Sequence, residues 1–240
     1  MRSPEFTTGM IRPIEVYKES WELMKGEFWM IFGIVLVGII VGGLIPVIIM
    51  GPMMCGVFMC LLDKIDGKPA SFDKLFKGFD YFLPGLIVSL IVMLPVFIFI
   101  FAVYIPMIAI SIAGPRLGQD QVMPYIFGIL AVELIVGIVM TVIHSLLLFA
   151  FPLIVDKKLS GLQAVKASIR AVWANKGGVG GLFGVGILVA IVGYALFCIG
   201  IYLAIPVIMV ATTVAYRKVF PLKEGELNLE PPPPTAYQGL

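Results

Sequence analysis

Four long blocks almost without charge constrain the fold of this chain more than any other feature. Three of the blocks carry no charged side chain, and the fourth carries only Glu133. The blocks are residues 28–62, 81–115, 121–155 and 177–216. Runs of 18 or more such residues are typical of membrane-spanning helices. With 60% hydrophobic and 13% charged residues, the chain is also more apolar than a soluble domain. The sequence predicts an all-α, polytopic integral membrane protein.

The basic residues indicate how many times the chain crosses the membrane. A helix needs about 20 residues to cross the hydrocarbon, so each block is long for one span and barely enough for two. If the first and last blocks are hairpins and the middle blocks each cross once, every lysine and arginine except Arg116 lies on one side. This asymmetry is typical of a cytoplasmic face. The expected spans are residues 28–44, 46–62, 84–113, 124–154, 178–199 and 201–216.

We therefore expect six transmembrane helices in the cytoplasmic (inner) membrane of a prokaryote, with both termini in the cytoplasm. The first two spans are short, at about 26 Å each. Whether the first hairpin crosses the whole bilayer is left open.

Amphipathic segments precede the apolar blocks on the cytoplasmic side. Ile14, Tyr17, Trp21 and Met24 follow a spacing of 3, 4 and 3 residues, which is one face of a helix. Segments 71–82 and 160–176 show the same periodicity, with lysines off the apolar face. Such helices are typical of the membrane interface, where lysines meet anionic lipid headgroups. The alternative is a helix packed on neighbouring loops. The expected interfacial anchors are Tyr17, Trp21, Trp29, Phe72, Phe79 and Trp173.

These segments suggest an internal repeat. Each of three hairpin units has an interfacial helix followed by two spans, and the sequence Ile-Pro-Val-Ile occurs at both 45–48 and 205–208. The units are residues 14–62, 71–154 and 160–216. An even number of spans in each unit would make the repeats parallel.

The two ends of the chain are expected to lie outside this arrangement. Residues 1–9 resemble vector-derived sequence, so a single membrane domain is expected over residues 10–220. Residues 221–240 are polar and include four consecutive prolines, which predicts a disordered, proline-rich tail.

Glu133 and His144 are the ionisable side chains expected well inside a span. Eleven residues separate them, which places them about 20° apart around the helix and about 16 Å apart along it. Ionisable groups inside a membrane often mark ion or proton paths. The alternative is two neutral side chains that hydrogen-bond to a neighbouring helix or lie near an interface.

The remaining composition argues against familiar chemistry. The net charge of +2 suggests no nucleic-acid partner, and the three cysteines lie inside apolar blocks. The chain has a single histidine, so it lacks the set of side chains that most hydrolase and metalloenzyme sites require. We expect no catalytic residues, metal or cofactor. Asp63, Asp66 and Asp156 are expected to be solvated groups near the inner face.

Two segments carry a resemblance to known proteins. FPLIVDKKLSGLQAVKASIRAVWANKGG (151–178) and TTVAYRKVF (212–220) resemble a broad group of bacterial and archaeal six-span membrane proteins of unknown function. This group includes the membrane domain attached to some glycerophosphodiester phosphodiesterases. The resemblance implies the six-span layout. It implies no reaction, because the chemistry of those phosphodiesterases lies in a separate soluble domain.

Two functions fit these observations. The first is a non-enzymatic membrane protein that organises lipid or binds a partner, through its hairpins and surface helices. The second is a small-solute or ion transporter or channel that uses the Glu133/His144 helix face. The expected partners are the bilayer and its anionic headgroups, with a second copy of the chain or another membrane protein left open.

Overall fold

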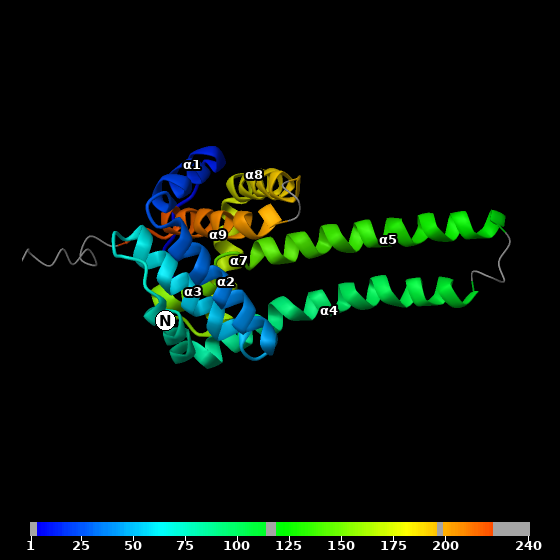
Figure 1. Cartoon of the computed structure of the whole chain (residues 1–240), viewed down its shortest axis with the longest axis horizontal. Helices are drawn as coiled ribbons and strands as arrows, with labels where there is room; N and C mark the ends of the chain where they lie inside the picture. Colours follow the sequence, from blue (N-terminus) through cyan, green and yellow to red (C-terminus); the bar gives the residue numbers. More distant parts are fainter. Residues whose placement is uncertain (1–3, 114–118, 196–198, 223–240) are drawn as a thin grey trace, which may run out of the picture.

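All regular structure in the described part of the chain is helical. The computed structural model describes residues 4–113, 119–195 and 199–222 (Figure 1). The α-helices are α1 Pro13–Met24, α2 Phe28–Leu44, α3 Met50–Ile65, α4 Phe82–Ala113, α5 Gln119–Leu146, α6 Ala150–Lys157, α7 Gly161–Ala174, α8 Lys176–Ala195 and α9 Ile199–Val219. Two short 3₁₀ helices, η1 Phe72–Lys74 and η2 Phe76–Tyr81, precede α4. The all-α prediction is confirmed for these residues.

Helices lie at all six positions where spans were expected. Four helical stretches are long and apolar enough to cross a membrane: η1 to α4, α5 with α6, α8, and α9. A fifth is possible if α1 and α2, which meet at an angle of 104°, count as one broken span. α2 and α3 have only 17 and 16 residues. The structure therefore supports four or five spans, and the count of six stays a prediction.

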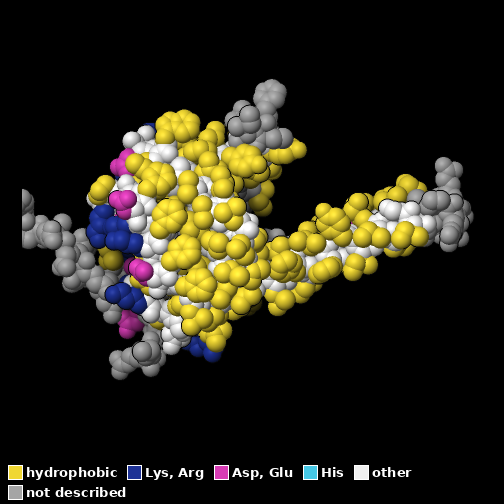
Figure 2. Space-filling model, turned by 60° about the horizontal axis from the view of Figure 1, so that its bottom comes forward, with side chains coloured by type: hydrophobic (Ala, Val, Ile, Leu, Met, Phe, Trp, Pro, Cys, Tyr) yellow, Lys and Arg dark blue, Asp and Glu magenta, His cyan; other side chains and the backbone are white. Residues whose placement is uncertain are grey.

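Three helical hairpins point away from one end of the molecule (Figure 1). They are α2–α3, α4–α5 and α8–α9. The α4–α5 hairpin is the longest, because 32 and 28 residues give helices of about 48 and 42 Å. It extends well beyond the body that the other helices form. Charged side chains gather at the opposite end of this body, and hydrophobic side chains cover most of the rest of the face in Figure 2.

α3 lies at the centre of the body, where it packs against α2, α4, α6 and η2. Its glycines allow close contact between backbones. A Cβ on Gly56 would lie 1.8 Å from the carbonyl oxygen of Leu75, and one on Gly51 would lie 2.3 Å from that of Gly85. Larger side chains at these positions would push the start of α4 and the preceding 3₁₀ turns away from α3.

The expected span 124–154 is interrupted near its end, and α5 and α6 together still form one candidate span. α5 ends at Leu146 and α6 begins at Ala150. Pro152 explains the interruption, since it has no N–H to donate to the carbonyl four residues earlier and its ring clashes with that carbonyl. Buried Ser168 of α7 compensates for it. The Ser168 hydroxyl accepts a hydrogen bond from the N–H of Phe149 at 3.1 Å and donates one to the carbonyl of Leu146 at 2.7 Å.

The amphipathic segments follow the prediction to different degrees. Residues 71–82 form 3₁₀ turns instead of an α-helix, and Leu75 is completely buried there. α7 is an α-helix, and its buried face consists mainly of small residues and packs on α4 and α6. Leu162, Ile169 and Trp173 of α7 are exposed. One side of α7 is therefore packed on the body, and its contact with the membrane interface stays a prediction.

Residues 4–9 pack on the body. The N–H of Thr7 donates to the carbonyl of Val219 at 2.9 Å, and the side chain of Asn175 bonds to the backbone of both Gly9 and Thr7. Phe6 contacts the ring of Phe220. The vector origin predicted for residues 1–9 is untested by these contacts. Residues 1–3 and the predicted tail from 223 onward lie outside the described residues.

A pair of glycine substitutions tests the close approach at α3. Gly56→Ala should destabilise the protein by about 1–3 kcal/mol, because the new methyl group meets backbone. Gly128→Ala in α5 is the control, since no atom lies within 4 Å of its added Cβ, and it should be stabilising by up to about 1 kcal/mol. Unfolding in detergent, followed by circular dichroism, measures both. Equal stability of the two variants would contradict this packing.

Candidate functional site

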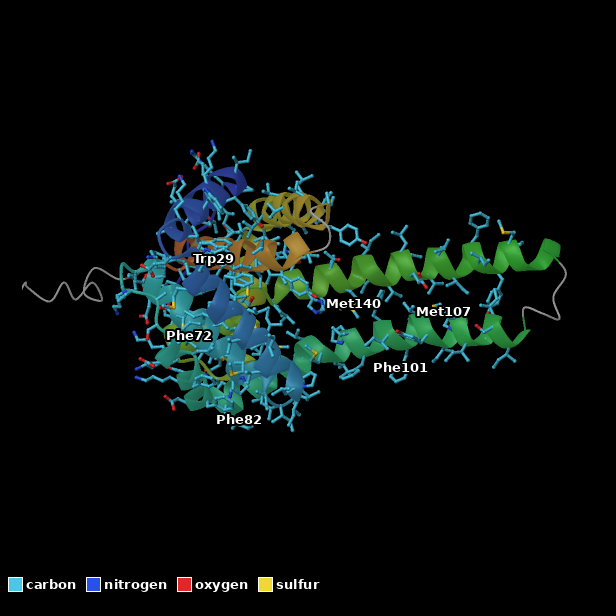
Figure 3. All side chains as sticks on the ribbon, viewed as in Figure 1. Trp29, Phe72, Phe82, Phe101, Met107 and Met140 are labelled. Atoms are coloured by element: carbon cyan, nitrogen blue, oxygen red, sulfur yellow. The ribbon has the colours of Figure 1, made fainter. Side chains whose placement is uncertain are left out.

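Glu133 and His144 both lie on the side of α5 that faces α4. Both are half-buried, as are Val136, Gly137 and Met140 between them. Figure 3 shows Met140 on this inner side and Phe101 of α4 projecting away from the hairpin. The predicted common face is therefore present. Its neighbour is α4.

The structure does not bring Glu133 and His144 together. Eleven residues of helix separate them by about 16 Å. His144 Nδ1 lies 2.9 Å from the carbonyl oxygen of Met140, one turn earlier in the same helix. Glu133 has no hydrogen-bond or ion-pair partner among the described residues. The hollows found between the body helices are lined by other residues.

The outer surface of the α4–α5 hairpin is almost entirely apolar and exposed. Phe101 and Ile105 of α4 are each 61% exposed, and Leu134 of α5 is 66% exposed. The two helices pack on each other, and many apolar side chains on their other faces are exposed. In water this surface would be a large aggregation hazard. A hydrocarbon environment is the one that suits it.

The predicted interfacial aromatics are exposed on the body to different degrees. Trp29 and Trp173 are the most exposed, whereas Tyr17 is half-buried. Trp21 packs edge-on against Phe28 at the junction of α1 and α2. Phe72 and Phe79 are close to 40% exposed, at 38% and 40%. The described contacts do not test their role as membrane anchors.

A cluster of charges joins the ends of three helices, and sequence analysis missed it. Arg217 near the end of α9 donates to Asp156 Oδ1 at 3.0 Å and to Asp66 Oδ2 at 2.7 Å. Tyr216 donates its hydroxyl to Asp156 Oδ2 at 2.6 Å. Asp66 caps α3 and Asp156 lies near the end of α6. We call Arg217, Asp66, Asp156 and Tyr216 the charged junction.

The charged junction is mostly buried, which corrects the prediction of solvated aspartates. The side chains of Arg217, Asp66 and Asp156 are 13%, 18% and 10% exposed. Burial raises the pKa of Asp66, and the guanidinium of Arg217 opposes this shift. Asp66 depends on this guanidinium for its charge balance, whereas Asp156 also pairs with the adjacent Lys157 at 3.2 Å. The junction is suited to holding α3, α6 and α9 in register, and its four residues line none of the three hollows described between the helices.

Two further ion pairs lie beside the junction. Lys64 of α3 donates to Glu27, at the bend between α1 and α2, at 2.5 Å. This hydrogen bond lowers the pKa of Glu27. Lys74 of η1 pairs with Asp63 of α3. Asp63 is thus also paired instead of solvated. Together these contacts fix the loops at the charged end.

Among the described residues, no group of three His, Cys, Asp or Glu side chains could hold a metal ion. Comparisons of the chain with family models, curated proteins and solved structures found no match. The resemblance drawn from residues 151–178 and 212–220 therefore stays a prediction.

Replacing Arg217 tests the charged junction. Arg217→Met leaves the buried Asp66 without its ion-pair partner and Asp156 with Lys157 alone, so we expect a loss of about 3 kcal/mol or more in stability. Adding Asp66→Asn and Asp156→Asn to that variant should recover part of the loss. Arg12→Met is the control, because Arg12 and its partner Glu15 are 75% and 61% exposed, and it should leave unfolding unchanged. Unfolding in detergent provides the measurement, and a neutral Arg217→Met would contradict the structural role.

Proposed function

We propose that this chain is a non-enzymatic protein of a prokaryotic inner membrane that organises lipid around three hairpins of unequal length. The observation that carries the proposal is the difference between α4–α5 and its neighbours. α4 is about 48 Å long, whereas α2 is about 26 Å. Both hairpins point away from the end of the body where the charged side chains gather (Figures 1 and 2).

A flat bilayer cannot match hairpins of both lengths. Its hydrocarbon core is about 30 Å thick, which is shorter than α4 and longer than α2. A helix longer than the hydrocarbon core either tilts or thickens the bilayer around it, and a shorter helix thins the bilayer. One rigid body that contains both would impose both distortions within a few lipid diameters. Local deformation of the bilayer is therefore the activity that this geometry favours.

The same proposal includes the six-span layout with both termini in the cytoplasm. Two observations support it. Asp66 follows α3 and Arg217 lies near the end of α9, which are the second helices of their hairpins, and Asp156 lies in α6, which follows α5. The three units therefore meet through one cluster of charges. The charged end of the body is rich in lysine and arginine (Figure 2). A basic cytoplasmic face attracts the anionic lipids of the inner leaflet.

Shortening the long hairpin tests the proposal. Deleting residues 101–107 and 125–131 removes two turns, or about 10.5 Å, from each helix and almost preserves the orientation of the remaining side chains. We expect wild-type protein to change the size and shape of phosphatidylglycerol-containing vesicles, and the shortened protein to do so much less. Electron cryomicroscopy and light scattering of proteoliposomes measure the effect.

The matched control changes the composition of the hairpin without changing its length. Phe101→Leu with Phe127→Leu keeps two exposed apolar positions apolar and should leave vesicle remodelling intact. If wild-type and shortened proteins leave vesicles equally unaltered at the same protein density, the lipid-organising function is wrong.

Transport is the second candidate function, and the unpartnered Glu133 is the observation that favours it. A carboxyl group on the α4-facing side of a membrane helix is unusual unless it pairs or serves an ion path. Under our proposal, proteoliposomes should show no flux of protons or monovalent cations above protein-free vesicles. The opposite outcome is a flux that wild-type protein and His144→Ala both support and that Glu133→Gln abolishes. That result would assign the protein to transport.

A further inference from the structure

A hollow lined almost entirely by hydrocarbon lies between α1, α8 and α9. Its volume is about 270 Å³, larger than the apolar cavity of about 150 Å³ that is known to bind benzene in another protein. Leu182, Phe183 and Ile187 of α8 form one wall, and Ile208 of α9 forms another. Such a hollow accepts several carbons of an alkyl chain.

Both hydroxyl groups that line this hollow already have a hydrogen-bond partner in the protein. The hydroxyl of Tyr17 is directed to the carbonyl of Leu182 at 3.4 Å, and that of Thr212 donates to the carbonyl of Ile208 at 2.9 Å. A ligand that placed a polar group inside would gain no partner and would lose its hydration. The hollow therefore suits an alkyl chain and disfavours a polar solute.

A second, more open hollow begins where the first one ends. It has a volume of about 640 Å³, and it is lined by Tyr17, Lys18 and Trp21 of α1 with Val185 of α8. The two hollows share Tyr17, and Val185 is the neighbour of Gly186 in the first. A Cβ on Gly186 would lie 2.8 Å from the hydroxyl of Tyr17, so this glycine lets the ring sit between the two spaces.

In the orientation proposed above, the open hollow lies at the level of the membrane interface. Glu19, next to Lys18, pairs with Lys218 at the basic end of α9 at 2.7 Å. Ile208 in the apolar hollow is ten residues earlier in α9, or about 15 Å deeper along the helix axis. A molecule that filled both spaces would have a headgroup near α1 and a chain that runs along α9 toward the bilayer interior.

Charge at the open hollow favours an anionic headgroup. Lys18 is exposed and has no ion-pair partner among the described residues. Glu22, the one acidic side chain that lines the same hollow, is paired with Lys25 at 2.6 Å. The nearby indole of Trp21 is a side chain typical of the headgroup region.

We propose that these joined hollows bind one anionic phospholipid of the cytoplasmic leaflet, with an acyl chain between α1, α8 and α9 and its phosphate at Lys18. This site rests on the proposed membrane function, because it names the lipid class that the body retains. The site is separate from the effect of the unequal hairpins, which deform the bilayer through the length of their helices alone.

Native mass spectrometry of the delipidated full-length protein tests the site. Dioleoyl phosphatidylglycerol and dioleoyl phosphatidylcholine are the probes, titrated in detergent. We expect one tight phosphatidylglycerol adduct, followed by weaker ones. Ala190→Phe, which fills the apolar hollow, should weaken the first adduct about tenfold or more. Val192→Phe, at an exposed position of the same helix, is the control and should bind as wild type.

The headgroup contact has its own pair of variants. Lys18→Gln should weaken the first phosphatidylglycerol adduct about threefold and leave phosphatidylcholine unchanged. Lys166→Gln, at an exposed position of α7, should change neither. Ile208→Phe is a second filling variant, in case Ala190→Phe fails to fold. If folded Ala190→Phe and Ile208→Phe bind lipid as wild type does, or all adducts are equally weak, the site is absent and the lipid is only annular.

The two proposals can fail separately in these experiments. Ala190→Phe should lose the tight adduct and still remodel vesicles, whereas the protein with the shortened hairpin should keep the adduct and lose remodelling. Loss of the tight adduct in the shortened protein as well would contradict a site confined to α1, α8 and α9.

Discussion

Arg217 carries a positive charge that two helix ends share, and the arrangement of the body depends on it. In hydrocarbon, helices gain little from the hydrophobic effect by associating, because lipid tails are as apolar as leucine. Specific polar contacts and close packing then decide which helices stay together. Arg217 joins the ends of α3 and α6 to α9 through Asp66 and Asp156. Gly51 and Gly56 complete the association by allowing η2 and α4 to approach α3 closely. The hairpins diverge from this fixed end.

The sequence predicted the helices well because the membrane leaves few alternatives. Backbone groups in hydrocarbon must be satisfied within the segment, so long charge-free blocks form helices. α2 begins and ends at the residues expected, Phe28 and Leu44. The periodicity of Ile14, Tyr17, Trp21 and Met24 likewise predicted α1, and the placement of Glu133 and His144 on one face followed from helix geometry alone. These are local properties, which neighbouring residues determine.

The remaining features depend on residues far apart in the chain. The interruption of α5 needs Pro152 and also Ser168, a serine in another helix whose role no local pattern reveals. Asp66 and Asp156 look like surface aspartates in the sequence. Arg217, which joins them, lies 151 residues after Asp66 and 61 residues after Asp156. Segment 71–82 has helical spacing but tightens into 3₁₀ turns, where Gly78 packs against the backbone of Pro52 and Gly56. Tertiary packing overrides local preference at these places.

The order of the junction residues along the chain has a consequence for biosynthesis. Asp66 and Asp156 precede Arg217 by 151 and 61 residues, so both leave the ribosome before the side chain that joins them to α9. Asp156 has the neighbouring Lys157 as a partner at 3.2 Å, whereas Asp66 lacks its ion-pair partner until α9 is made. Because an unpaired charge is costly to bury, Asp66 stays in contact with water until then. The body therefore closes only after α9 has been synthesised.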